Sequence, residues 1–88
     1  MNDKELIKKV IPLLLDRDSR YRHIYSVSEK STRLLAKIFK CRKREVELDL
    51  NLSNFIDKYP EIFSLYGIKT VDNGYGKHLE YLDQPIHY

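Results

Sequence analysis

The sequence predicts a small α+β domain with three helical segments, one strand and a C-terminal β-hairpin. Apolar residues recur at helical spacing in three parts of the chain, whereas elsewhere they alternate with polar residues or flank a turn signal. The 88 residues, 42% of them hydrophobic, suffice for one small domain and not for two. We therefore expect a single domain over residues 1–88, with residues 83–88 as a tail.

The first helix is predicted to begin at Asp3, which can cap it. Its apolar positions have helical spacing and comprise Leu6 or Ile7, Val10, Ile11 and Leu14. Pro12 lies inside this pattern, and because proline lacks a backbone N–H we expect the helix to kink or restart there. The polar, aperiodic residues 16–25 are expected to form a connection.

The second helix is predicted over residues 27–41, with Ser26 and Glu29 at the spacing of a capping box. Its apolar face comprises Val27, Leu34, Leu35, Ile38 and Phe39. On nearly the opposite side, a sector of about 80° contains Lys30, Arg33, Lys37, Lys40 and Arg44. The pattern predicts a helix with one face in the core and a basic stripe on the other.

A strand is predicted next, because apolar and polar residues alternate with period two. The apolar positions are Val46, Leu48, Leu50 and Leu52, and the acidic Glu45, Glu47 and Asp49 would line the outer face. We expect one core in which Leu34, Leu35, Ile38 and Phe39 meet Leu48, Leu50, Phe55 and Ile56.

The third helical segment is expected to begin at a cap on Asn51 or Ser53, with Phe55, Ile56 and Tyr59 facing inward. Pro60 should end it and begin a short helical turn that stops at Gly67. Residues 68–71 and 78–82 flank an Asn73-Gly74 pair, which is typical of a hairpin turn.

This order of elements resembles the winged-helix branch of the helix-turn-helix superfamily. The resemblance covers residues 3–82 and rests on the element order, the helix start SVSEKSTR at residues 26–33 and the Asn73-Gly74 turn at the position of the wing. Residues 54–63 also look like a segment of some RNA-binding winged-helix modules. The resemblance implies nucleic-acid binding. It departs from the family just before the wing, where the recognition helix normally lies, because that segment has Asp57, Lys58 and Glu61 and no arginine.

Charge is divided unevenly along the chain. Residues 1–44 contain thirteen basic residues (Lys and Arg) and five acidic ones (Asp and Glu). Residues 45–88 contain three basic and eight acidic residues. A basic half of this kind attracts polyanions, and an acidic half faces away from them or binds a basic partner.

The residues expected to contact nucleic acid are cationic or aromatic: Arg17, Arg20, Tyr21, Arg22, Lys30, Arg33, Lys37, Lys40, Arg42, Lys43, Arg44, Tyr75 and Lys77. Cations neutralise phosphates, and tyrosines in the 17–25 segment suit base stacking on single strands. The same residues also have structural interpretations. A basic stripe is often only solvated, cations near a helix C-terminus oppose its dipole, and the arginines near residue 20 can pair with Asp16 and Asp18.

Catalysis is not expected. His23, His78 and His87 lie far apart, no metal-ligand spacing joins them to Cys41, and no phosphate-binding glycine loop is present. We expect no enzyme activity, metal or cofactor. No membrane span or secretory signal is found, and a single cysteine fits a reducing compartment, so we expect a cytoplasmic protein.

The sequence thus favours a nucleic-acid-binding protein, with duplex DNA ahead of single-stranded DNA or RNA. A transcription regulator or replication accessory protein of a microbe, virus or mobile element fits this size. The alternative is a protein-interaction module or inhibitor that uses the acidic C-terminal half. The oligomeric state stays open.

Overall fold

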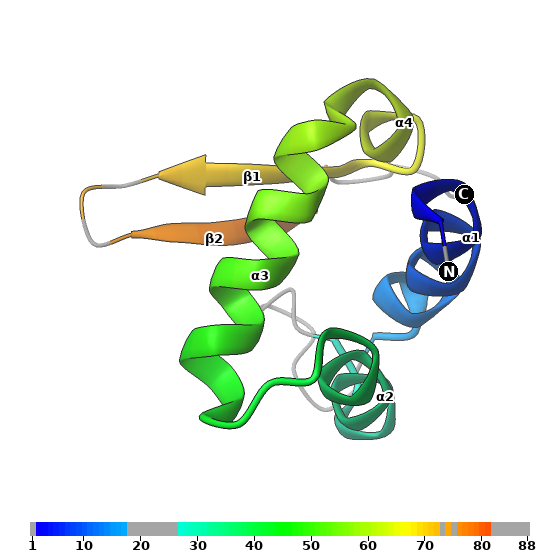
Figure 1. The fold of residues 1–88 in the computed structure, drawn as a ribbon. Coiled ribbons are helices and arrows are strands. Elements are labelled where there is room, and N and C mark those ends of the chain that lie inside the picture. The colour runs from blue at the N-terminus through cyan, green and yellow to red at the C-terminus, as the bar shows by residue number, and fades with distance from the viewer. Residues whose placement is uncertain (1, 18–26, 73, 75, 82–88) are drawn as a thin grey trace. The chain divides into compact units, whose positions relative to one another are not determined.

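A computed structural model of the protein describes residues 2–17, 27–72, 74 and 76–81. The fold is α+β, as predicted, with helices followed by a two-stranded antiparallel sheet (Figure 1). The chain divides into two compact units, Met1–Arg42, called unit 1, and Lys43–Tyr88, called unit 2. The single domain expected over residues 1–88 stays a prediction.

Unit 1 begins with α1 (Asp3–Leu15), whose predicted apolar face is confirmed, since Ile7, Val10, Ile11 and Leu14 are all buried. The cap is Asn2 and not Asp3, because the Asn2 side chain accepts a hydrogen bond from the Glu5 N–H at 2.9 Å. The restart expected at Pro12 is wrong, because the helix continues to Leu15. Pro12 is exposed, so water can solvate the carbonyl that the proline leaves without a donor.

Unit 1 continues with α2 (Glu29–Phe39), which buries Leu35 and Ser31. Ser28 caps this helix by accepting from the Ser31 N–H at 3.2 Å, and the cap predicted on Ser26 lies outside the described residues. Ile38 and Phe39 are half-buried. The core position predicted for Leu34 is wrong, because this side chain is 38% exposed.

A cluster of hydrogen bonds joins the end of α1 to the start of α2. The Asp16 carboxylate accepts from the hydroxyl groups of Ser28 and Ser31, each at 2.7 Å. The Ser28 N–H also donates to the Asp16 carbonyl at 2.8 Å. Arg17 and Val27 then form an isolated antiparallel bridge. The connection between the two helices is therefore fixed at both of its ends.

Unit 2 begins with α3 (Arg44–Lys58), so the strand predicted over residues 46–52 is wrong. Leu48 and Leu52 are four residues apart, and Ile56 follows at the same spacing, which is the spacing of one helix face. The helix buries Leu48, Leu52, Phe55 and Ile56 on one side. It leaves Val46 and Leu50 exposed, by 76% and 56%, so the core position predicted for Leu50 is also wrong. The cap predicted on Asn51 or Ser53 lies inside this helix.

The remaining elements of unit 2 follow the prediction closely. Pro60 occupies the first turn of α4 (Pro60–Ser64), and Gly67 takes a φ of 74° before the hairpin. Strands β1 (Ile68–Asp72) and β2 (Lys77–Tyr81) pair antiparallel, with Ile68 opposite Tyr81 and Asp72 opposite Lys77. Gly74, at φ 93°, donates its N–H to the Asp72 carboxylate at 3.0 Å, whereas Asn73 lies outside the described residues.

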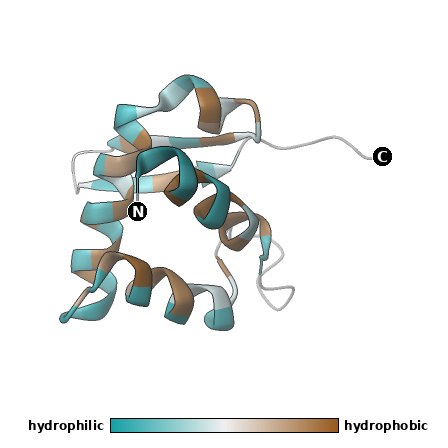
Figure 2. Cartoon of the chain, turned by 45° about the vertical axis from the view of Figure 1, so that its right-hand side comes forward, coloured by the Kyte–Doolittle hydropathy of each residue, from teal (hydrophilic) through white to brown (hydrophobic). Residues whose placement is uncertain are grey.

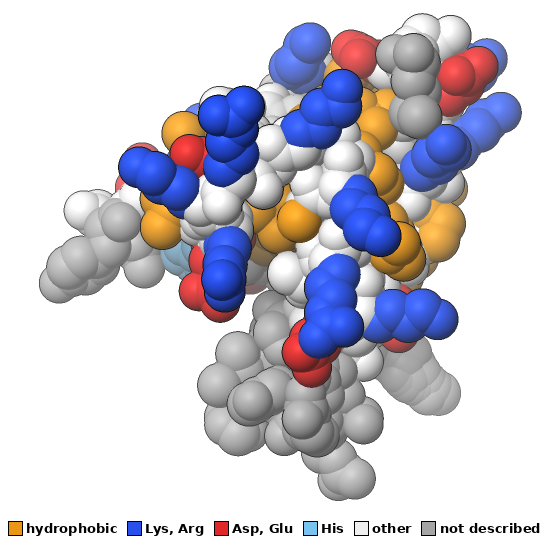
Figure 3. Space-filling model, turned by 60° about the horizontal axis from the view of Figure 1, so that its bottom comes forward, with side chains coloured by type: hydrophobic (Ala, Val, Ile, Leu, Met, Phe, Trp, Pro, Cys, Tyr) orange, Lys and Arg blue, Asp and Glu red, His pale blue; other side chains and the backbone are white. Residues whose placement is uncertain are grey.

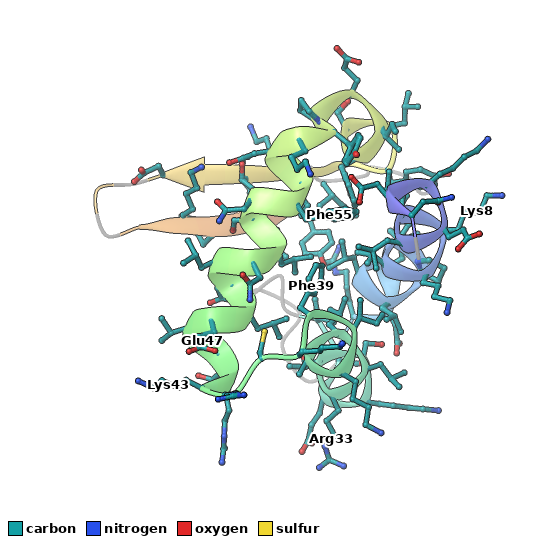
Figure 4. All side chains as sticks on the ribbon, in the orientation of Figure 1. Lys8, Arg33, Phe39, Lys43, Glu47 and Phe55 are labelled. Carbon is teal, nitrogen blue, oxygen red and sulfur yellow. The ribbon has the colours of Figure 1, made fainter. Side chains whose placement is uncertain are left out.

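Helix α3 contacts both strands of the hairpin and also α4 (Figure 1). The Phe55 ring, labelled in Figure 4, meets the fully buried Phe63 ring edge to face, and their centroids are 5.9 Å apart. At the surface, the Asp57 carboxylate accepts from the Thr70 hydroxyl and the Lys77 ammonium group. Each helix of the chain carries hydrophobic and hydrophilic positions (Figure 2), which is the pattern of elements with one buried side.

Candidate nucleic-acid interface

The basic face of α2 is formed by Lys30, Arg33 and Lys37, which are all exposed. At about 100° per residue these three side chains fall within a sector of roughly 60°, centred almost opposite Leu35. Figure 4 shows Arg33 directed away from the side of α2 that carries Phe39. Burial of Leu35 and Ser31 fixes the rotation of the helix, and the three cations must therefore face outward.

Few anions neutralise this face among the described residues. Arg33 pairs with Glu29 one turn earlier at 2.9 Å, but both side chains are largely exposed, by 75% and 67%. Such a pair contributes little and is readily exchanged for an external anion. Lys30 and Lys37 have no acidic partner within the described part of the chain. Figure 3 shows Lys and Arg side chains projecting from the molecular surface.

The predicted stripe ends earlier than expected. Lys40 is the C-cap of α2 and takes a left-handed conformation, with φ 54° and ψ 44°. The Cys41 N–H donates to the Ala36 carbonyl at 3.0 Å, which closes the helix end. Arg42 is exposed and ends unit 1. Arg44 begins a different helix, so the prediction that it shares the face of Lys30 is wrong.

The predicted cations of unit 2 lie at the start of α3 and on β2. The backbone N–H of Lys43 donates to the Glu47 carboxylate at 3.4 Å, where Figure 4 shows both residues, and the Lys43 side chain is exposed. Arg44, at φ 51°, is the first residue of that helix. The Lys77 ammonium group is bound by Asp57, which leaves it less available to a phosphate. Among the described residues, Lys77 is therefore the predicted cation of unit 2 whose charge has an acidic partner.

The segment between the helices of unit 1 holds other predicted contacts. Arg17 is exposed and lies in the bridge with Val27. Arg20, Tyr21 and Arg22 lie outside the described residues, as does Tyr75 in the hairpin turn. The bridge places Arg17 beside Val27, two residues before α2 begins.

Three exposed lysines of α1 were not among the residues predicted to contact nucleic acid. Lys4, Lys8 and Lys9 are all exposed, and Lys8 points outward from α1 in Figure 4. Lys4 and Lys8 lie one turn apart and on the same side of the helix. Their signal was available in the sequence, since they occupy the polar positions of an otherwise regular apolar pattern.

Charge divides between the units as it does along the sequence. Unit 1 contains eleven Lys and Arg and five Asp and Glu, a net charge of +6, whereas unit 2 contains five and eight, a net charge of −3. Partial burial and the nearby charge of Glu45 raise the pKa of Asp49 on α3, although His78 of β2 opposes this effect. Glu45, Glu47 and Asp49 give the first half of α3 three carboxylates, which repel a polyanion.

The described residues contain no group of three or more His, Cys, Asp or Glu side chains that could hold a metal ion. No helix in the described ranges is long and apolar enough to cross a membrane. Comparisons with protein families, with curated proteins and with solved structures found no match.

Proposed function

We propose that the chain is a nucleic-acid-binding protein, without enzyme activity, that contacts the backbone of duplex DNA through the basic face of α2. The observation that supports this most is the exposure of Lys30, Arg33 and Lys37 on one side of a helix whose other side is buried. Each phosphate that such a cation neutralises releases condensed counterions, which favours binding. Two further exposed lysines of unit 1 add positive charge: Lys40 at the end of α2 and Lys8 on α1.

Duplex DNA is favoured because α2 is a regular element of the right size. Its eleven residues span about 16 Å, and an α-helix about 10–12 Å in diameter fits a major groove about 12 Å wide. Helix α4, which precedes the hairpin, has five residues and contains Glu61, so a recognition helix in that position is not favoured. In the proposed winged-helix arrangement, α2 takes the DNA contact and the hairpin is an accessory element.

The test is a fluorescence titration of the full chain with duplex DNA, single-stranded DNA and RNA at two salt concentrations. The proposal predicts that duplex binds best and that its affinity falls steeply with salt, by about 0.9 log units per contact for each log unit of salt. Tighter binding of single strands would move the contact to the arginine- and tyrosine-containing segment after Arg17. Absence of binding to all three at low salt would refute the proposal.

A second candidate function is protein recognition by unit 2, favoured by its net charge of −3. The carboxylates of unit 2 that could dock a basic partner include those of Asp57, Glu61, Asp72 and Asp83. Two of these have partners inside the unit, since Asp57 binds Lys77 and Thr70 and Asp72 accepts from Gly74. The carboxylates of Asp57 and Asp72 are therefore less available to a basic partner than the sequence suggested.

A further inference from the structure

Helix α3 exposes two large apolar side chains on its N-terminal half. Val46 is 76% exposed and Leu50 is 56% exposed. They lie four residues apart, so their Cβ atoms are neighbours on the helix surface, about 5–6 Å from each other. Single exposed apolar residues are ordinary, but an adjacent pair on one helix face makes a small docking surface.

Carboxylates border this apolar pair. On a helical projection Asp49 and Glu47 lie on opposite sides of it, each about 60° from the nearer apolar residue. Glu45, one turn before Asp49 on α3, adds a further carboxylate close to it. A partner for this surface needs an apolar side chain with cations close beside it.

Helix α2 of the same chain has this complementary arrangement. Leu34 is 38% exposed, with Lys30 one turn before it and Lys37 one turn after it. Both lysines are exposed and have no acidic partner among the described residues. One chain thus carries an acidic apolar surface on unit 2 and a basic apolar surface on unit 1.

We propose that copies of this chain associate head to tail, with the Val46 and Leu50 surface of one copy against the Leu34 surface of a second copy. The contact removes the three apolar side chains from water, and it places Lys30 and Lys37 near Glu47 and Asp49. The two surfaces differ, so the contact is heterologous, and each copy keeps one free surface for a further copy.

The association is weak and salt-sensitive. Two short helix faces bury less than the roughly 1,200 Å² of a standard stable interface, and screening by salt weakens the attraction between exposed charges. The proposal does not rest on nucleic-acid binding. If α2 also binds DNA, the two uses of its basic face compete, and added duplex dissociates the assemblies.

Sedimentation velocity of the full chain between about 10 µM and about 1 mM tests the association, since a weak interface populates complexes in that range. At low salt the average mass should rise with concentration beyond that of a monomer, and high salt should restore the monomer. A chain that stays monomeric at the highest concentration and low salt would overturn the proposal.

Two variants test the geometry of the contact. Val46→Gln with Leu50→Gln disables the α3 surface, and Lys30→Gln, Leu34→Gln and Lys37→Gln together disable the α2 surface. All five side chains are exposed and glutamine is a good helix former, so both variants should fold. Each variant alone should be monomeric, whereas a mixture should form a 1:1 complex, because it contains one intact surface of each kind. A mixture that remains monomeric would refute head-to-tail contact.

Leu65→Gln is the matched control. Leu65 is 82% exposed and follows α4, so its replacement removes an apolar side chain from another surface of unit 2 and should leave the association unchanged. Equal loss of association in this variant would overturn the assignment to α3. DNA binding by the variant at Val46 and Leu50, measured in dilute solution, reports separately on the proposed function and should equal that of the parent.

Discussion

Two lysines of the hairpin in unit 2 and two lysines of α2 in unit 1 differ in whether an acidic side chain pairs with them. In unit 2, Lys77 binds Asp57 and Lys69 lies 3.4 Å from Glu80, its neighbour across the hairpin. In unit 1, Lys30 and Lys37 face outward with no acidic partner among the described residues. A cation already bound within its own unit has less to gain from a phosphate, because a new contact must replace an existing one. The exposed Lys43 and Arg44 also have no acidic side-chain partner among the described residues, so the α2 face is distinguished by three exposed cations on one side of a single helix.

The units also differ in how each accommodates one buried serine. Ser31 of unit 1 is 2% exposed and donates its hydroxyl to Asp16. Ser53 of unit 2 is 1% exposed, and its hydroxyl has no hydrogen-bond partner within the described residues. A buried hydroxyl is stable only when it is hydrogen-bonded, so the same residue type is expected to stabilise one unit and not the other.

The largest expected effect concerns the core of unit 2. Phe63→Ala removes a fully buried ring that contacts Phe55, and it should cost about 3–5 kcal/mol of unfolding free energy. In a chain this small that loss can abolish folding. Thermal or urea unfolding followed by circular dichroism measures it. Leu65→Ala is the control and should change stability by less than about 0.5 kcal/mol, since Leu65 is exposed.

The next effect concerns the connection in unit 1. Asp16→Ala removes the acceptor for the hydroxyls of Ser28 and Ser31. The buried Ser31 hydroxyl then has no partner, which should lower the unfolding free energy by about 1–3 kcal/mol. Urea unfolding of this variant, of Ser31→Ala and of the double variant forms a thermodynamic cycle. The double variant should lose less than the sum of the single losses, because no buried hydroxyl remains at position 31. Additive losses would show that Asp16 and Ser31 are not coupled.

The two buried serines provide a matched pair of substitutions. Ser31→Ala should destabilise the chain by about 1 kcal/mol, because it removes a satisfied hydrogen bond. Ser53→Ala should be neutral or slightly stabilising, because the hydroxyl that it removes has no partner in the described structure. The same unfolding experiment measures both, and equal losses at the two positions would contradict the contrast between the units.

A smaller effect depends on pH. Hydrogen bonds from Lys77 and then Thr70 hold the pKa of Asp57 below its ordinary value. The folded pKa is below the unfolded one, so the stabilisation is fully present above about pH 4 and is lost as pH falls through the folded value. The group is exposed, which limits the effect to about 1 kcal/mol. Asp57→Asn should therefore be less stable than the parent at pH 6, and the difference should shrink in acid. A difference that is constant with pH would contradict this role.

The sequence was sufficient to predict the elements whose apolar spacing or turn residues fit only one type of secondary structure. The apolar spacing of α1 and the Asn-Gly turn signal of the hairpin each favour a single local structure, and both elements form as predicted. The segment around Leu50 fits two structures. Leucines at every second position are typical of a strand, but Leu48 and Leu52 are also four residues apart, as on one face of a helix. The helix forms since Phe55 and Ile56 extend that second spacing into one buried side.

The candidate interface was predictable only in part. Lys30, Arg33 and Lys37 were correctly placed on one helix, because their spacing alone puts them on one side. Arg44 was misplaced, since the sequence gives no sign that Lys40 adopts a left-handed conformation and ends the helix. The pairing of Lys77 with Asp57 depends on the contact between α3 and β2, which sequence spacing does not reveal.

The most direct test of the central claim compares two variants that lose the same charge. Lys30→Ala with Lys37→Ala removes two cations of α2 that have no acidic partner among the described residues, and Lys58→Ala with Lys69→Ala removes two cations from unit 2. The measurement is the affinity for a short DNA duplex across a range of salt, after circular dichroism has shown that both variants are folded. The α2 variant should bind more weakly, with a salt slope reduced by about two units, whereas the unit 2 variant should match the parent. Equal weakening by both variants would show that net charge alone attracts DNA, and it would contradict an interface on α2.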